Sequence, residues 1–207
     1  LFIDELVRHR ALNNSGQGEV LSLEDALWKR ASDLDPAARQ VLELVALSSG
    51  KILQQTAARA AEMDFDRFSK LIATLRVAHL VRTRGMRASD SVEPFHDRIR
   101  VAVRAHLDRD TIRNHHRRLA VALEMSGSAD PEALMVHWQE ADDASRAADY
   151  AQIAAEKAWK ALAFDRAAQF YQACIDLNPH SVADKAEILT KLGNALAHLS
   201  AVAVVPR

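Results

Sequence analysis

In Val92-Glu93-Pro94-Phe95-His96-Asp97-Arg98-Ile99 an extended segment changes into an amphipathic helix, and the elements on either side can be predicted outward from this corner. Proline lacks a backbone N–H and disfavours helical conformation in the residue before it, so Glu93 is predicted to be extended. The helix is predicted to run from His96 to Leu107, and Asp97 suits the positive end of its dipole. Its apolar face is predicted from residues that recur at every fourth position: Phe95, Ile99, Val103 and Leu107.

The residues before this corner predict short helices followed by a β-hairpin. Helices are predicted over 22–34, 36–47, 51–61 and 64–78, from apolar residues at three- and four-residue spacing. Leu80-Val81-Arg82-Thr83 is β-prone, Arg84-Gly85 is a turn signal, and Val92 to Phe95 is expected to pair back as the second strand. Short helices followed by a hairpin are the order of a winged-helix domain, which we place at 22–126.

The residues after the corner predict helices only. One helix is expected from Asp108 to about Met125, where Ser126-Gly127-Ser128 breaks the chain. The alanine-rich remainder, 127–207, is expected to be helical, with breaks near Asp142-Asp143, Ala163-Phe164 and Asn178-Pro179. The predicted class is therefore mainly α, with a winged-helix domain followed by helical repeats.

The segment from Ala148 to Pro179 resembles a tetratricopeptide repeat (TPR). In that comparison Ala155 takes the small position of the first helix. The small, aromatic, small and proline positions of the second helix are taken by Ala167, Tyr171, Cys174 and Pro179. Leu192-Gly193 is similar to the Leu-Gly pair of a further, displaced repeat, so the array is expected to continue beyond Arg207.

Composition limits the possible functions. The chain has 207 residues and a formal net charge of −1, so no overall field attracts it to DNA or to an acidic membrane. Its one cysteine argues against disulfides and favours a reducing compartment, so a cytoplasmic location is expected. No apolar run approaches the roughly 20 residues of a membrane span, and no signal peptide is recognisable.

The candidates for enzymatic or metal chemistry are weak. Ser49-Gly50-Lys51-Ile52 has the Gly-Lys of a phosphate-binding loop, but Val45 replaces its first glycine and Ile52 its Ser or Thr. His115 and His116 are adjacent on a predicted helix and point about 100° apart, so one zinc ion could not easily use both. For His137, His198 and Cys174, packing with a local partner is the favoured interpretation. We therefore expect no enzyme activity, no metal and no cofactor in this chain alone.

A winged helix could instead bind DNA through the helix at 64–78. Its first turn carries Asp64 and Asp66 beside Glu62, and Arg67 and Lys70 offset them only in part. The predicted hairpin favours nucleic-acid binding more than this helix does, because it carries three arginines: Arg82, Arg84 and Arg87. DNA binding remains the alternative function, and we expect it to be non-specific.

The whole order of elements resembles the region after the nucleotide-binding domain in signal-transduction ATPases with numerous domains (STAND regulators). These include apoptotic, plant-resistance and MalT-like regulators and bacterial Ser/Thr kinases that carry such an ATPase module. Leu1-Phe2-Ile3-Asp4-Glu5-Leu6 is similar to a run in that family's lid, and 1–21 would be the end of the lid helix and a linker. The chain starts within a periodic pattern and is expected to be part of a longer protein.

Phe95-His96-Asp97 is similar to the family's Met-His-Asp motif, with Phe in place of Met. The resemblance implies that His96 contacts the β-phosphate of ADP in the full-length protein, and that Asp97 orients the motif. A histidine at a helix start can also simply cap its own helix, and this alternative stays open. The expected function is thus a regulatory region that docks on an upstream nucleotide-binding domain of the same chain, while the repeats bind a partner protein.

Overall fold

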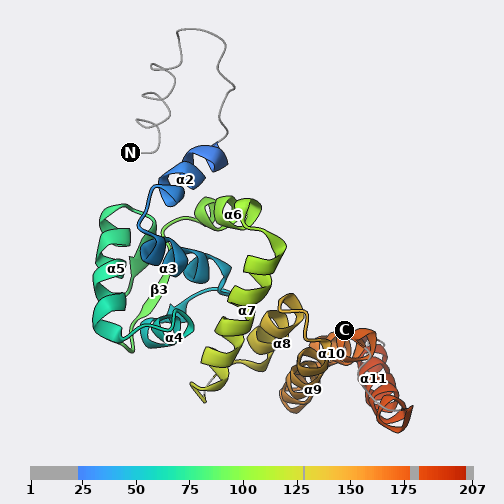
Figure 1. The fold of residues 1–207 in the computed structure, drawn as a ribbon. Coiled ribbons are helices and arrows are strands. Elements are labelled where there is room, and N and C mark those ends of the chain that lie inside the picture. The colour runs from blue at the N-terminus through green and yellow to red at the C-terminus, as the bar shows by residue number, and fades with distance from the viewer. Residues whose placement is uncertain (1–22, 128, 178–181, 204–207) are drawn as a thin grey trace, which may run out of the picture.

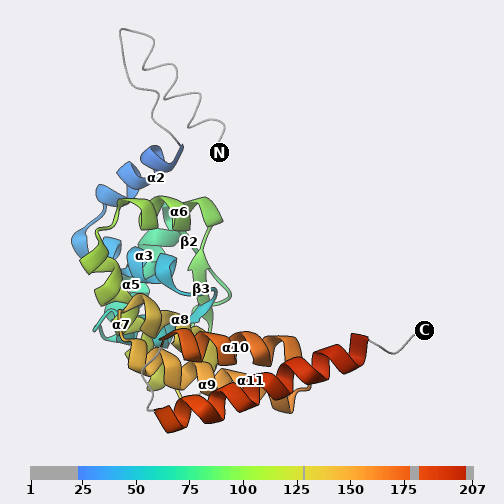
Figure 2. The ribbon, with the colours of Figure 1, turned by 90° about the vertical axis from the view of Figure 1, so that its right-hand side faces the viewer.

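The structure is a computed structural model that describes residues 23–127, 129–177 and 182–203. In that part the chain forms ten helices and a small three-stranded sheet, so the predicted mainly α class is confirmed. Figures 1 and 2 show two groups of elements, in which helices α2 to α7 surround the sheet and helices α8 to α11 extend from them. We call these the first unit and the helical array. The helix and linker predicted within 1–21 lie outside the described residues.

Several helices of the first unit begin at a residue whose side chain caps them. Asp35 accepts a hydrogen bond from the Ala37 N–H at 3.0 Å, and Pro36 occupies the first turn. Asp64 caps the next long helix by accepting from the Arg67 N–H at 2.8 Å. The four helices before the hairpin are α2 (Leu23–Ser32), α3 (Pro36–Leu47), α4 (Gln54–Ala60) and α5 (Phe65–Val77).

The predicted hairpin is confirmed and belongs to a larger sheet. Strands β2 (Val81–Thr83) and β3 (Ser91–Pro94) pair antiparallel, with Val81 opposite Pro94. A further strand, β1 (Ile52–Leu53), pairs with the other edge of β3 and gives the order β1-β3-β2. The prediction of helix from Lys51 was therefore wrong at its start. The two-residue strand forms only because β3, about forty residues later, offers an edge, and local periodicity contains no trace of that pairing.

The turn between β2 and β3 is tightly closed. Gly85 has φ +112°, and a Cβ at this position would collide with the carboxylate of Asp90. That carboxylate accepts from the Arg87 N–H at 2.7 Å, while Gln54 of α4 donates to the Gly85 carbonyl at 3.2 Å. Glycine at 85 is therefore favoured by the backbone conformation, and a larger residue would also displace the Asp90 carboxylate.

Two helices follow the hairpin, α6 (Asp97–His106) and α7 (Arg109–Glu124). The predicted apolar stripe is correct for Ile99 and Val103, which are each 1% exposed. It is wrong for Phe95, which is 39% exposed. Phe95 comes before the first residue of α6, so helical periodicity does not set the direction of its side chain. The Arg98 guanidinium donates to Glu24 of α2 at 2.6 Å and ties α6 to the start of the described chain.

The core of the first unit consists of large aliphatic and aromatic side chains. Phe68 and Leu75 of α5 are fully buried, as their spacing predicted. Leu71, expected on the same face, is only partly buried at the edge of this core. The other largest fully buried apolar residues of this unit are Leu42, Leu44, Leu80, Ile99 and Leu119.

The helical array begins and breaks close to the predicted positions. Its helices are α8 (Pro131–Glu140), α9 (Ala144–Lys160), α10 (Phe164–Leu177) and α11 (Val182–Ala203). Asp142 and Leu162 have φ of +63° and +58°, so the α8–α9 turn and the α9–α10 turn each contain a left-handed residue. The predicted break at Asn178-Pro179 lies outside the described residues.

Small side chains form the interior of the array. Ala155, Ala167 and Cys174 are each 0% exposed, and Tyr171 is 2% exposed. Burial raises the pKa of the Cys174 thiol to about 11, so the thiol stays protonated and acts as a small packing group. Among the described helices, none combines the length and apolar character needed to cross a membrane.

Candidate functional site

His96 is the first candidate site residue, and it lies at the exposed corner between β3 and α6. Its backbone is extended, with φ −144° and ψ 148°, and it is the N-cap of α6. The ring Nδ1 accepts a hydrogen bond from the Arg98 N–H at 3.2 Å. Because a neutral imidazole has one donor and one acceptor nitrogen, this cap places the ring hydrogen on Nε2.

Asp97, the second candidate, begins α6 with its side chain 81% exposed. Its carboxylate lies 3.4 Å from Nε of Arg100, one turn along the helix. Arg100 also donates to the carbonyl of Ala46 at 2.9 Å, and to that of Ser48. Asp97 is therefore connected, through one guanidinium, to the C-terminal end of α3.

The surroundings of His96 contain exposed apolar atoms. Phe95 makes an edge-to-face contact with His79, with ring centroids 5.6 Å apart, and its N–H donates to the Leu80 carbonyl at 3.0 Å. Val77, at the end of α5, is 81% exposed. We call Val77, His79, Phe95 and His96 the corner surface. It combines a polar ring with apolar groups, as surfaces for protein contact do.

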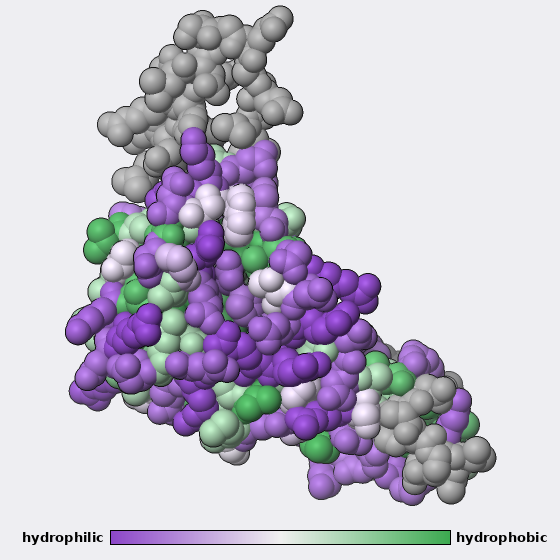
Figure 3. Space-filling model, viewed as in Figure 1, coloured by the Kyte–Doolittle hydropathy of each residue, from purple (hydrophilic) through white to green (hydrophobic). Residues whose placement is uncertain are grey.

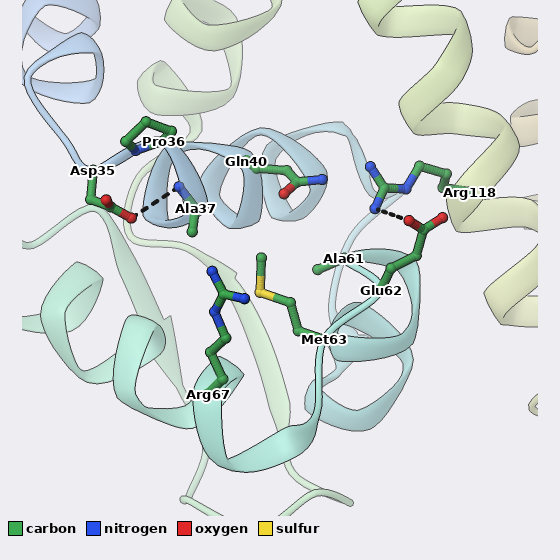
Figure 4. Close-up of a pocket in the computed structure, with 9 residues that line it drawn as sticks. All are labelled: Asp35, Pro36, Ala37, Gln40, Ala61, Glu62, Met63, Arg67 and Arg118. Carbon is green, nitrogen blue, oxygen red and sulfur yellow. Dashed lines mark hydrogen bonds and ion pairs between the residues drawn. The ribbon is translucent and has the colours of Figure 1, made fainter.

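A surface groove lies on another side of the first unit, with a volume of about 490 Å³ (Figure 4). The guanidinium of Arg67 points into it between the ends of α3 and α5. Arg118 of α7 lines it as well, but its Nη2 lies 3.4 Å from the Glu62 carboxylate. Asp35 adds a second acid to the lining, so the two arginines face two carboxylates. The groove shows no charge preference for a ligand.

The described residues also contain a buried histidine cluster that sequence analysis did not predict. His115, His116 and His137 are 5%, 2% and 1% exposed. Nε2 of His115 lies 2.9 Å from Oε2 of Glu43, and Nδ1 of His116 lies 2.9 Å from Nδ1 of His137. Nε2 of His137 reaches Oγ of Ser49 at 3.3 Å.

The expectation of a local partner for His137 was therefore wrong. Its partners come from α7 and from the end of α3, distant in sequence, because α8 turns back against both. The only signal in the sequence was the adjacent pair His115-His116 on a helix. Two neighbours on a helix point about 100° apart, so both can be buried only if elements pack on two sides of that helix.

Ser49 and His137 are the residue types of a catalytic nucleophile and its general base, but their environment does not suit nucleophilic catalysis. Burial lowers the pKa of His137 to about 3, with the neighbouring His116 adding to the effect. A base this weak accepts a proton poorly near neutral pH. Ser49 also follows the C-terminal end of α3, where the helix dipole would repel a developing oxyanion.

In the part of the chain that is described, no group of three or more His, Cys, Asp or Glu side chains is arranged to hold a metal ion. In the array, His198 stacks on Phe164 with centroids 4.6 Å apart and meets Trp159 edge to face at 5.4 Å. These rings join three helices, α9, α10 and α11. His198 is exposed and its ring partners are distant in sequence, so the expectation of a local partner was wrong for it as well, and packing of the rings accounts for these contacts.

Comparison with known proteins found no match to a protein-family model, to a curated protein or to a solved structure.

Proposed function

We propose that this chain is the regulatory region of a STAND-type signal-transduction ATPase. A winged-helix domain would dock on a nucleotide-binding domain of the same protein, and TPR-like helices would bind a partner. The order α3, β1, α4, α5, β2, β3 supports the winged-helix assignment, as does the sheet order β1-β3-β2. Alternating helices joined by short turns, with alanines at the contacts, support the repeat assignment.

The observation that carries the proposal is the geometry of His96. The ring is exposed at a corner, and its cap bond to the Arg98 N–H leaves Nε2 as the donor nitrogen. A phosphate oxygen of ADP is a suitable acceptor, and the N-terminus of α6 adds a favourable dipole. Asp97, the residue after His96, is tied through Arg100 to the end of α3, so the corner has a fixed position on the domain.

The proposed docking surface is the corner surface. Phe95 and Val77 would supply apolar area beside the polar contact of His96. On the array, Ile153 of α9 and Leu189 of α11 are 47% and 49% exposed, and they are the first candidates for contact with a partner protein. On the face shown in Figure 3, apolar residues occur in small separate groups, which suits such local contacts better than one broad apolar interface.

The test uses the full-length protein with two substitutions that separate phosphate sensing from helix capping. His96→Ala removes both roles, whereas His96→Ser keeps an N-cap but removes the imidazole. A hydrogen bond involving a charged group contributes about 1.5–3 kcal/mol, so both variants should release ADP roughly ten- to a hundredfold faster and signal more without stimulus. The chain alone, which has no phosphate-binding loop, should bind neither ADP nor ATP.

Faster release in the alanine variant alone would assign His96 to capping. Unchanged release and unchanged activity in both variants would reject the ADP-sensing role and leave a scaffold function, in which no ATPase responds to changes at His96. Asp97→Asn is a third variant, which removes the ion pair with Arg100 and keeps the shape of the side chain.

DNA binding is the second candidate, and the observation that favours it is the same order of elements with arginines in the β2–β3 hairpin. Arg82 is already 3.2 Å from Glu93, and Asp64 and Asp66 begin α5. We expect only non-specific affinity, with Kd about 10⁻⁴ to 10⁻⁶ M near physiological salt. A gel shift that shows a nanomolar, sequence-selective complex, weakened by Arg67→Ala and Lys70→Ala, would favour this candidate instead.

A further inference from the structure

The buried histidine cluster lies at the joint between the first unit and the helical array. His116 belongs to α7, and its partner His137 belongs to α8, the first helix of the array. Ser49, the other partner of His137, follows α3 in the first unit. The two hydrogen bonds of His137 therefore both hold α8 against the first unit.

The ring nitrogens match two neutral imidazoles. With Nδ1 atoms 2.9 Å apart, one ring must donate and the other accept. If His116 donates, the hydrogen of His137 is on Nε2 and points to Ser49. Nε2 of His116 is buried and has no hydrogen-bond partner among the described residues, so this arrangement leaves only a lone pair unsatisfied there. The reverse arrangement would bury an unsatisfied N–H, which proteins avoid.

Protonation acts against this contact. A first added proton would place a positive charge on rings that are almost fully removed from water. A second proton would put hydrogens on both Nδ1 atoms, and the hydrogen bond between the rings would be lost. Burial accordingly lowers the pKa of His116 to about 4 and that of His137 to about 3.

The charges around the pair do not cancel this effect. Glu140 of α8 favours a protonated His116, but two hydrogen bonds of 3.0 and 2.9 Å pair its carboxylate with Arg104 of α6. On α7, His115 faces Glu43 of α3. On the α9 side, the Arg146 guanidinium lies 4.3 Å over the ring of Trp138, the residue after His137. The nearest carboxylates are thus already engaged by other groups.

We propose that His116, His137 and Ser49 form an acid-operated latch, which holds the helical array against the first unit at neutral pH and releases it as the histidines take up protons. Released histidines regain an ordinary pKa near 6.5, so opening is linked to proton uptake. Between pH 6.5 and 4.5 the opening equilibrium should rise roughly forty- to fiftyfold for each histidine. The latch does not depend on the proposed ATPase context.

The test measures the distance between the two parts of the whole chain as a function of pH. Fluorophores are placed at Arg84→Cys in the first unit and Lys185→Cys in the array, both exposed positions, with the buried Cys174 replaced by Ala. Energy transfer should stay constant above pH 6.5, and a second distance should appear below about pH 5. Far-UV circular dichroism at the same pH values should show that the helices persist.

His137→Phe is the matched variant, because phenylalanine keeps the ring but cannot take up a proton. In it the pH response of the second distance should weaken to the share of His116, whose pKa is still lowered by burial, and it should vanish in the double variant His116→Phe/His137→Phe. His106→Phe, at an exposed histidine of α6 whose ring stacks on Trp28 outside the joint, should leave the transition unchanged. An unaltered transition in His137→Phe, or loss of helix together with loss of energy transfer, would overturn the proposal. If His137→Phe fails to fold, NMR titration of the native rings decides, since His116 and His137 titrating near pH 6.5 while the joint is closed would equally overturn it.

Discussion

The first unit and the helical array are both mainly helical, but they are held together by side chains of different size. Phe68, Leu42 and Leu75 fill the first unit, whereas the contacts of α9 and α10 are made largely by alanines such as Ala155 and Ala167. Large side chains bury much apolar area and stabilise one shared core. Alanine buries little area but lets neighbouring helices approach closely, so each array helix depends mainly on the next. The first unit should therefore be destabilised most by substitutions that remove side-chain volume, and the array by substitutions that add it.

The largest effect is expected for Leu75→Ala in the first unit. Leu75 is 0% exposed, so a cavity there should lower the free energy of unfolding by roughly 2–5 kcal/mol, measured by urea titration. Leu71→Ala should have a smaller effect, because Leu71 is only partly buried. Lys70→Ala is the exposed control, and equal shifts in all three variants would contradict this assignment of the helix face.

In the array the damaging change is the opposite one. Ala155→Leu should destabilise the array by roughly 1–3 kcal/mol, because a larger side chain has no room at the contact of α9 with its neighbours. Ala144→Leu, at an exposed position of the same helix, is the control. A neutral Ala155→Leu would show that the array has space that its alanines do not fill, and the contrast with the first unit would weaken.

Acid should act on the contact between the regions. The pKa values of His116 and His137 are lowered to about 4 and about 3 in the folded chain. The unfolded chain therefore binds more protons between pH 6.5 and those values, and stability falls as pH falls. From pH 7 to 5.5 we expect a loss of about 1 kcal/mol for each histidine, read from urea titrations. His116→Phe should remove the part of this pH dependence of stability that comes from His116. An unchanged pH dependence in that variant would contradict the lowered pKa of His116.

The smallest effect concerns the chain between the regions and involves no loss of stability. The sequence predicts a boundary within Ser126 to Asp130, and α7 ends just before it, at Glu124. Limited proteolysis should first cut within this stretch. Primary cuts inside α5 or α9, with the stretch intact, would argue that the two regions are not separate units.

The sequence allowed most element boundaries to be predicted because their causes are local. Asp35, Asp64 and Asp108 cap helices that begin within a residue or two of the predicted positions. The candidate site residues His96 and Asp97 were likewise chosen from a short motif, and their role in sensing ADP is a prediction. The burial of Phe95 was predicted wrongly, because the helical period was extended to a residue that lies before the helix begins.

Local sequence was enough to predict where most helices start, where turns break them, and which residues are small enough for helices to approach closely. Each of these depends on neighbours within a few residues, through capping, proline geometry and periodic burial. Only the tertiary structure decided that β1 exists, since Ile52 needs Val92 as a partner. It also decided that His116 and His137 share a hydrogen bond. Pairings between distant residues depend on how whole elements pack, and no local pattern in a single sequence specifies them.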